Sequence, residues 1–95
     1  MAVHRSSSME MFSAEGQWSY PCEVRISGGT IAVSYDEKGR LIVYEGEEVE
    51  PGHFKLTVQG AQHRATLHRF ADDEILEGWW LENGSEGMWR VTLDD

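Results

Sequence analysis

Apolar and polar residues alternate with a period of two along most of the chain from Cys22 to Leu93, and Gly, Asn or Asp residues interrupt this alternation about every ten residues. The intervening segments are rich in Val, Ile, Thr, Tyr and Trp, which favour strands. No segment repeats its apolar residues at the helical period of about 3.6 over three turns. The pattern therefore predicts an all-β fold, an antiparallel up-and-down meander of about seven or eight short strands that closes into a small barrel.

The glycine pair Gly28-Gly29 predicts the first hairpin. If these glycines form a two-residue turn, Val24 lies opposite Val33 and Ile26 lies opposite Ile31, so that apolar residues share one face. A slip of one residue would place apolar residues opposite polar ones. We therefore expect this register and one continuous core face.

The segment 36–39 predicts the second turn, a type I turn closed by its final glycine. This turn would pair Tyr35 with Leu41 and leave Tyr44 on the outer face. Further along the same strand, Gly46 marks the expected position of a β-bulge that shifts the register.

A turn at Gly60-Ala61 predicts a third hairpin. Its register pairs Phe54 with Leu67 on the core face and His53 with His68 on the outer face. The outer face of this hairpin is otherwise polar, as expected for a strand pair with one side in water.

The segment 83–87 predicts the last turn, which would pair Leu81 with Trp89. Trp80 would then face outward beside Arg90, in reach of a cation–π contact. The residues expected inside from this hairpin are Ile75, Trp79, Leu81, Trp89, Val91 and Leu93.

The chain divides into two parts by its composition. Residues 1–14 are polar and Ser-rich, and we expect them to form a flexible N-terminal arm whose Met and Phe side chains cover the outer face. Residues 15–95 are expected to form a single β-barrel domain, because a chain of 95 residues has room for one domain only.

Charge and cysteine content restrict the partners and the compartment. Asp and Glu total 17 against 8 Lys and Arg, and a net charge of -9 repels phosphate backbones, so we expect no nucleic-acid partner. The single cysteine, Cys22, excludes an intrachain disulfide and favours a cytoplasmic location. We expect no signal peptide and no membrane partner, since no apolar run is long enough.

The motif Gly16-Gln17-Trp18 resembles the Gly-x-Trp with which the first strand of calycin-like barrels, the lipocalins and avidins, begins. The aromatic-rich segment 77–89 is similar to the closing strands of such barrels. The resemblance implies a closed barrel of about 80 residues. The lipocalin disulfide and C-terminal helix have no counterpart here, which favours a narrow barrel filled by its own side chains or holding one small ligand.

Candidate chemistry is sparse, and we expect no cofactor, no metal and no catalytic residue. His53 and His68 form an incomplete zinc site, which Glu77 would complete on the outer face if its register shifts by one residue. The alternative is that Glu77 points inward. A Cys22–His63 dyad would lack an identified orienting group.

Two functions of different class follow from these observations. The first is a non-catalytic binding domain for a small apolar or mixed ligand at the barrel mouth, and its expected lining is Trp18, Tyr35, His63 and Trp79. The second is a protein-interaction or self-association module, a homodimer included, whose expected outer aromatic face is Tyr44, Trp80 and Arg90. The sequence identifies neither the ligand nor the protein partner.

Overall fold

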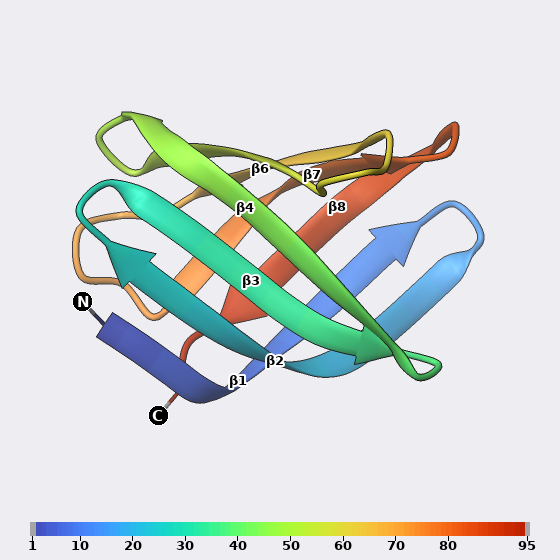
Figure 1. Ribbon diagram of the computed structural model, residues 1–95, viewed down its shortest axis with the longest axis horizontal. Helices are drawn as coiled ribbons and strands as arrows, with labels where there is room; N and C mark the ends of the chain where they lie inside the picture. Colours follow the sequence, from blue (N-terminus) through green and yellow to red (C-terminus); the bar gives the residue numbers. More distant parts are fainter. Residues whose placement is uncertain (1, 95) are drawn as a thin grey trace.

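The computed structural model describes residues 2–94 as a closed barrel in which each strand pairs with the next and β1 pairs with β8 (Figure 1). The strands are β1 (Ala2–Ser13), β2 (Gly16–Ser27), β3 (Thr30–Glu37), β4 (Arg40–Glu50), β5 (His53–Thr57), β6 (His63–His68), β7 (Ile75–Glu82) and β8 (Ser85–Thr92). The predicted all-β meander is confirmed. Within residues 2–94, no helix is long and apolar enough to cross a membrane.

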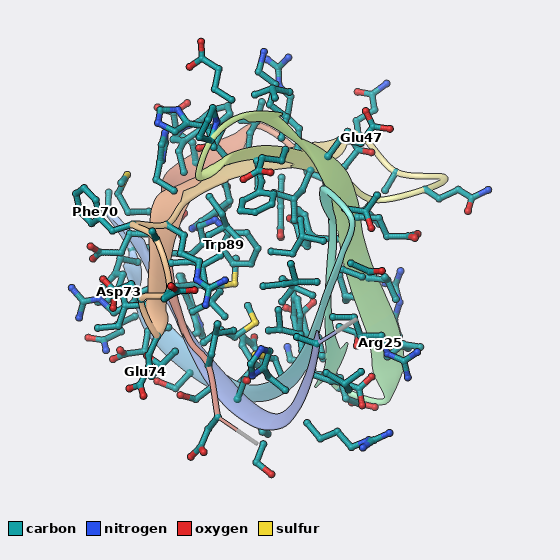
Figure 2. The ribbon with its side chains drawn as sticks, turned by 90° about the vertical axis from the view of Figure 1, so that its left-hand side faces the viewer. Arg25, Glu47, Phe70, Asp73, Glu74 and Trp89 are labelled. Carbon is teal, nitrogen blue, oxygen red and sulfur yellow. The ribbon has the colours of Figure 1, made fainter. Side chains whose placement is uncertain are left out.

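The core fills the barrel interior with side chains from every strand. Val24, Val33, Leu56 and Val91 are all buried there, which confirms the predicted two-residue alternation. Trp89 is the largest fully buried side chain and points into the interior when the barrel is viewed along its length (Figure 2). The large aromatic and aliphatic groups leave the barrel packed rather than hollow.

Residues Ala2–Ser13 form strand β1, so the prediction of a flexible arm was wrong for this segment. β1 pairs with β2 on one side and with β8 on the other, which removes the two edges that an open sheet would expose. The alternating side chains of Ser7, Met9 and Met11 point into the core. Met1 of the predicted arm and Asp95 of the predicted domain lie outside the described residues.

Two predicted hairpin registers are confirmed. Gly28 and Gly29 both have positive φ angles, 56° and 87°, and close a two-residue turn with Val24 opposite Val33. In the β5–β6 hairpin, Phe54 pairs with Leu67 and His53 pairs with His68. The loop of this hairpin is longer than the predicted two-residue turn, since the strands end at Thr57 and begin again at His63.

The predicted register of β3 and β4 was wrong by one residue. The chain turns through Lys38 and Gly39, whose φ angles are 53° and 82°, so that Tyr35 lies opposite Ile42 rather than Leu41. A slip of one residue exchanges the two faces of a strand. Tyr44 is therefore fully buried instead of facing outward.

The predicted register of β7 and β8 was also wrong. The turn is the two-residue pair Asn83-Gly84, with φ angles of 50° and 85°, and not the longer segment 83–87. Trp80 therefore lies in the core opposite Gly87, while Trp79 faces outward opposite Met88. Of the residues predicted inside, Trp89, Val91 and Leu93 are buried, whereas Ile75, Trp79 and Leu81 are not.

The β-bulge of β4 lies elsewhere than predicted. Gly46 sits in a regular ladder, opposite Ile31 on one side and Leu56 on the other. The register shift comes between Glu48 and Glu50, directly before the turn into β5. Gly46 instead allows β4 and β5 to lie close together, because a Cβ atom at this position would lie 1.8 Å from the carbonyl oxygen of Lys55.

Candidate functional site: an aromatic and acidic barrel end

One end of the barrel gathers aromatic and acidic side chains on its inner side. β3 and β7 finish at this end, and β2 and β4 start there, at the right-hand side of Figure 1. We call the inward-facing set at this end the aromatic mouth; its members are Trp18, Tyr20, Tyr35, Glu37 and Glu82. Tyr44, which is fully buried, lies beneath it as its floor.

The strand alternation explains why these side chains point inward. Trp18 and Tyr20 pair with Met11 and Met9 of β1, which are both core residues, and paired residues of a ladder share a face. Glu37 follows Tyr35 by two residues, so it continues the inner face of β3 to the rim.

Hydrogen bonds and ring contacts connect the members of the mouth. The Tyr20 and Tyr35 rings pack at a centroid distance of 5.0 Å, and the Tyr20 hydroxyl donates to Glu37 Oε2 at 3.1 Å. Across the interior, the Tyr44 hydroxyl donates to Glu82 Oε2. Both carboxylates are thereby fixed at the same end of the barrel as the tyrosine rings.

The phenols at this end are in an environment that disfavours their ionisation. Burial raises the pKa of Tyr44 and Tyr35 well above the ordinary value, and the negative charge of Glu82 raises both further. The pKa of Tyr20 is raised by burial and by its hydrogen bond to Glu37. The phenols of Tyr20 and Tyr44 therefore keep their protons and donate them in hydrogen bonds to Glu37 and Glu82.

Several polar groups of the mouth lack a complementary partner. No Lys, Arg or His among residues 2–94 lies within ion-pair distance of Glu37 or Glu82, although Arg40 stands opposite Glu37 in the ladder. Tyr35 is only 4% exposed, and its hydroxyl forms no hydrogen bond with the part of the chain that the structure describes. Unpaired charge and an unused donor are thus held beside aromatic rings.

His63 adds a further unsatisfied group next to Glu82, its partner in the β6–β7 ladder. The Nδ1 atom of its ring is buried and has no hydrogen-bond partner. The ring also lines a hollow of about 390 Å³ at the β5–β6 loop, together with Gln62, Arg64 and Leu81.

The structure brings together three of the four residues predicted for a ligand site. Trp18, Tyr35 and His63 face inward at one end, whereas Trp79 lies on the outer face, where Arg64 stacks 5.9 Å from its ring centroid. Sequence reasoning missed Tyr20, Glu37 and Glu82. The alternation from Tyr35 to Glu37 was a usable signal for Glu37, but Glu82 depended on the register of β7.

The predicted outer aromatic face does not form from the expected residues. Tyr44 and Trp80 are in the core, and the exposed Arg90 pairs with Glu77 at 2.9 Å instead of stacking on Trp80. An outer apolar patch exists on the neighbouring row, where Phe12, Met88 and Trp79 lie side by side on β1, β8 and β7. Of these, Met88 is the most accessible, at 54% exposed.

The two histidines considered for a zinc site lie together, but Glu77, the third residue considered, is bound to Arg90. The His53 and His68 rings pack edge to face at 4.4 Å, and His68 lies opposite Glu77, as the shifted register predicted. Glu77 therefore points outward, not inward, and Arg90 binds its carboxylate. The described part of the chain contains no group of three or more His, Cys, Asp or Glu placed to hold a metal ion.

A second candidate region surrounds Phe70 at the opposite end of the barrel, where Figure 2 shows its ring pointing into solvent. Two hollows of about 430 and 380 Å³ flank the loop that carries it. Arg69 donates to the backbone of Asp73, and Glu77 binds Arg90. Glu48, Asp72 and Asp73 also line these hollows and form no ion pair within residues 2–94, but the one aromatic side chain other than histidine that stands free here is Phe70, without a second ring packed beside it.

Cys22 is buried in the core, and burial raises the pKa of its thiol from 9.0 to about 12. Nucleophilic cysteines need the opposite shift. No hydrogen bond connects Cys22 with His63 within residues 2–94, so the two side chains do not form a Cys–His dyad.

Comparison of the chain with family models, with curated proteins and with solved structures finds no significant match. The Gly16-Gln17-Trp18 motif begins β2 here, whereas the resemblance implied the first strand of the barrel. What the structure shares with the expected fold is the small, closed, antiparallel barrel.

Proposed function

We propose that this protein is a non-catalytic binding domain that takes a small ligand of mixed apolar and polar character at the aromatic mouth. The observation that carries the proposal is the conjunction of accessible aromatic rings with unpaired carboxylates. Trp18 is 43% exposed, and Glu37 and Glu82, the last residues of β3 and β7, lie at the same end of the barrel without a cation in ion-pair distance among the described residues. Binding sites of this kind combine apolar walls with few polar groups that orient the ligand.

The ligand would rest at the rim rather than deep in the barrel. Trp89, Tyr44 and Met9 fill the interior beneath the mouth and are at most 1% exposed. Trp18, near the start of β2, is the large side chain of the mouth that such a ligand would reach first.

A fragment screen followed by NMR tests the proposal. In the ¹⁵N-labelled protein, binding fragments are expected to shift the indole signal of Trp18 and the backbone signals of Tyr35 and Glu37. Trp18→Ala should abolish these shifts, because it removes the most accessible ring of the mouth. The matched control is Phe70→Ala, which removes an 84% exposed ring at the other end and should leave fragment binding unchanged.

Fragments that shift only signals around Phe70, in the wild type and in Trp18→Ala alike, would place the binding site at the other end and contradict the proposal. A screen in which no fragment shifts a mouth signal would contradict it as well.

The second candidate function is self-association through the outer patch of Phe12, Trp79 and Met88. The observation that favours it is a row of large apolar groups on three adjacent strands. Residues of both charges neighbour this row, namely the basic Arg64 and Arg90 and the acidic Glu10 and Glu86. A two-fold pair brings each patch onto its copy, and mixed charge at the edge suits such self-complementary contact.

Sedimentation over a concentration series tests this candidate. Self-association predicts a mass that rises with concentration and a constant monomer mass for Met88→Lys. Leu41→Lys is the matched control, since Leu41 is 71% exposed at the β3–β4 turn, away from the patch. A wild-type mass that stays monomeric at every concentration excludes the candidate.

A further inference from the structure

We infer that the ligand of the aromatic mouth is an organic cation, an alkylammonium group held by Trp18 and the Tyr20–Tyr35 ring pair and countered by Glu37 and Glu82. The inference rests on the proposed function and adds the chemical class of the ligand. Its first support is charge, because two carboxylates face one barrel end and no ion pair within residues 2–94 neutralises either of them.

The second support is the arrangement of aromatic rings. Tyr20 and Tyr35 pack with an interplanar angle of 40°, and Trp18 precedes Tyr20 by two residues on the same face of β2. Trp18 is 43% exposed and Tyr20 is half-buried, whereas Tyr35 is 4% exposed and supports the Tyr20 ring from below, so the ring faces open to a ligand are those of Trp18 and Tyr20. An ammonium group close to such faces is attracted by their negative quadrupoles. Aromatic rings grouped with carboxylates are thus complementary to alkylammonium ions and not to anions.

The third support is the unused hydroxyl of Tyr35. Tyr35 is 4% exposed, and its hydroxyl donates no hydrogen bond to residues 2–94. The hydroxyl oxygen itself is open to solvent, because His63 Nδ1 is the one fully buried side-chain polar atom without a partner among the described residues. The donor is therefore accessible at the mouth. A polar atom of a bound ligand, such as the hydroxyl of an amino alcohol, would satisfy it.

Choline and its uncharged isostere 3,3-dimethylbutan-1-ol separate charge from shape. Titrations followed through the Trp18 indole signal should show choline binding at least about tenfold more tightly than the isostere. Glu82→Gln and Glu37→Gln should each weaken choline binding several-fold and leave binding of the isostere unchanged. Arg40→Gln should strengthen choline binding, since Arg40 is the cation opposite Glu37 in the ladder.

The matched charge control is Glu47→Gln. Glu47 lies exposed on the outer face, near the other end of β4 (Figure 2), and its substitution changes the net charge by the same amount. It should leave choline binding unchanged. A titration with an Nε-trimethyllysine amide distinguishes a small-molecule ammonium compound such as choline from a protein side chain as the source of the ammonium group, and tighter binding of either compound supports the inference.

Equal affinity for choline and 3,3-dimethylbutan-1-ol, or choline binding that survives both Glu→Gln changes, overturns the organic-cation inference and leaves the binding function of the mouth standing. Fragments that shift the mouth signals while choline shifts none lead to the same conclusion. Since Gln accepts the tyrosine hydrogen bonds as Glu does, thermal unfolding of each variant verifies that the barrel is intact.

Discussion

At the scale of single residues, the buried tyrosines link folding to alkaline pH. Tyr44 and Tyr35 ionise less readily in the barrel than in water, because burial raises the pKa of each phenol and the negative charge of Glu82 raises it further. Above pH about 10 the phenols of the unfolded chain lose protons while those of the folded chain keep them. The unfolded state then binds fewer protons, so the free energy of unfolding falls as pH rises.

We predict that Tyr44→Phe makes this fall shallower. The slope of the unfolding free energy against pH is set by the difference in bound protons between the folded and unfolded states. Between pH 10 and 11, this difference should be smaller than in the wild type by up to about one proton. At neutral pH the variant should be less stable by about 1–2 kcal/mol, because Glu82 loses a buried donor. Urea unfolding at pH 7, 10 and 11 measures both effects.

Cys22 supplies an internal reference for this measurement. Its raised thiol pKa produces a fall of the same sign that begins near the ordinary value of 9.0, and it is present in the wild type and in Tyr44→Phe alike. Identical slopes for the two proteins above pH 10 would show that Tyr44 titrates in the folded barrel as it does in the unfolded chain.

At the scale of strands, Gly78 lets β7 and β6 approach each other more closely than any residue with a side chain would allow. A Cβ atom at this position would lie 1.8 Å from the carbonyl oxygen of Thr66, which is backbone and cannot rotate away. The same carbonyl accepts the indole N–H of Trp89 at 3.0 Å. The glycine therefore makes room for the hydrogen bond of the largest core residue.

We predict that Gly78→Ala destabilises the barrel by about 3 kcal/mol, through strand displacement and loss of the Trp89 hydrogen bond. Gly28→Ala is the control, because its φ of 56° disfavours alanine but nothing lies within 4 Å of the added atom. That change should cost about 1–2 kcal/mol. Urea midpoints and the near-UV signal of Trp89 measure the difference, and equal losses would contradict the steric explanation.

The strand scale also shows where sequence reasoning succeeded. The Gly28-Gly29 and β5–β6 registers followed correctly from alternation, because only one register placed all apolar residues on one face. In β4 and β7 both faces carry large apolar groups, so alternation alone did not select the register. In these strands the turn sets the register, and Lys38-Gly39 and Asn83-Gly84 each form a two-residue hairpin turn.

The errors in strand register also made part of the site prediction wrong. Tyr44 and Trp80 changed faces together with their strands, which removed the predicted outer aromatic face. Trp18 and Tyr35 belong to β2 and β3, whose mutual register was predicted correctly, and both lie on the inner face of their strands. The hydrogen bond from Tyr44 to Glu82 joins strands that are not neighbours, and local pattern carries no information on such contacts.

At the scale of the whole molecule, β1 is the element that closes the barrel. Its Ser7 hydroxyl accepts from the backbone N–H of Asp94 at 3.0 Å, and its Met9 is fully buried. Without β1, the paired edges of β2 and β8 would be open and part of the core would be exposed. The polar composition of this segment concealed the alternation, because serines occupy both faces.

We predict that deletion of residues 2–13 abolishes cooperative unfolding, whereas a flexible arm would be dispensable. Met9→Ala, a milder change, should cost about 2–4 kcal/mol, and the 52% exposed Val49→Ala serves as its control with little effect. Thermal unfolding by circular dichroism measures all three. A deletion variant that unfolds cooperatively at the wild-type temperature would refute the closing role of β1.

Both ends of the chain lie at the end of the barrel opposite the aromatic mouth, at the left-hand side of Figure 1. There the backbone N–H of Ser6 donates to the carbonyl of Asp94. A tether attached at either terminus would therefore leave from the far side. Copies immobilised on a sensor chip through a terminal tag should present Trp18 to the flowing analyte in one common orientation.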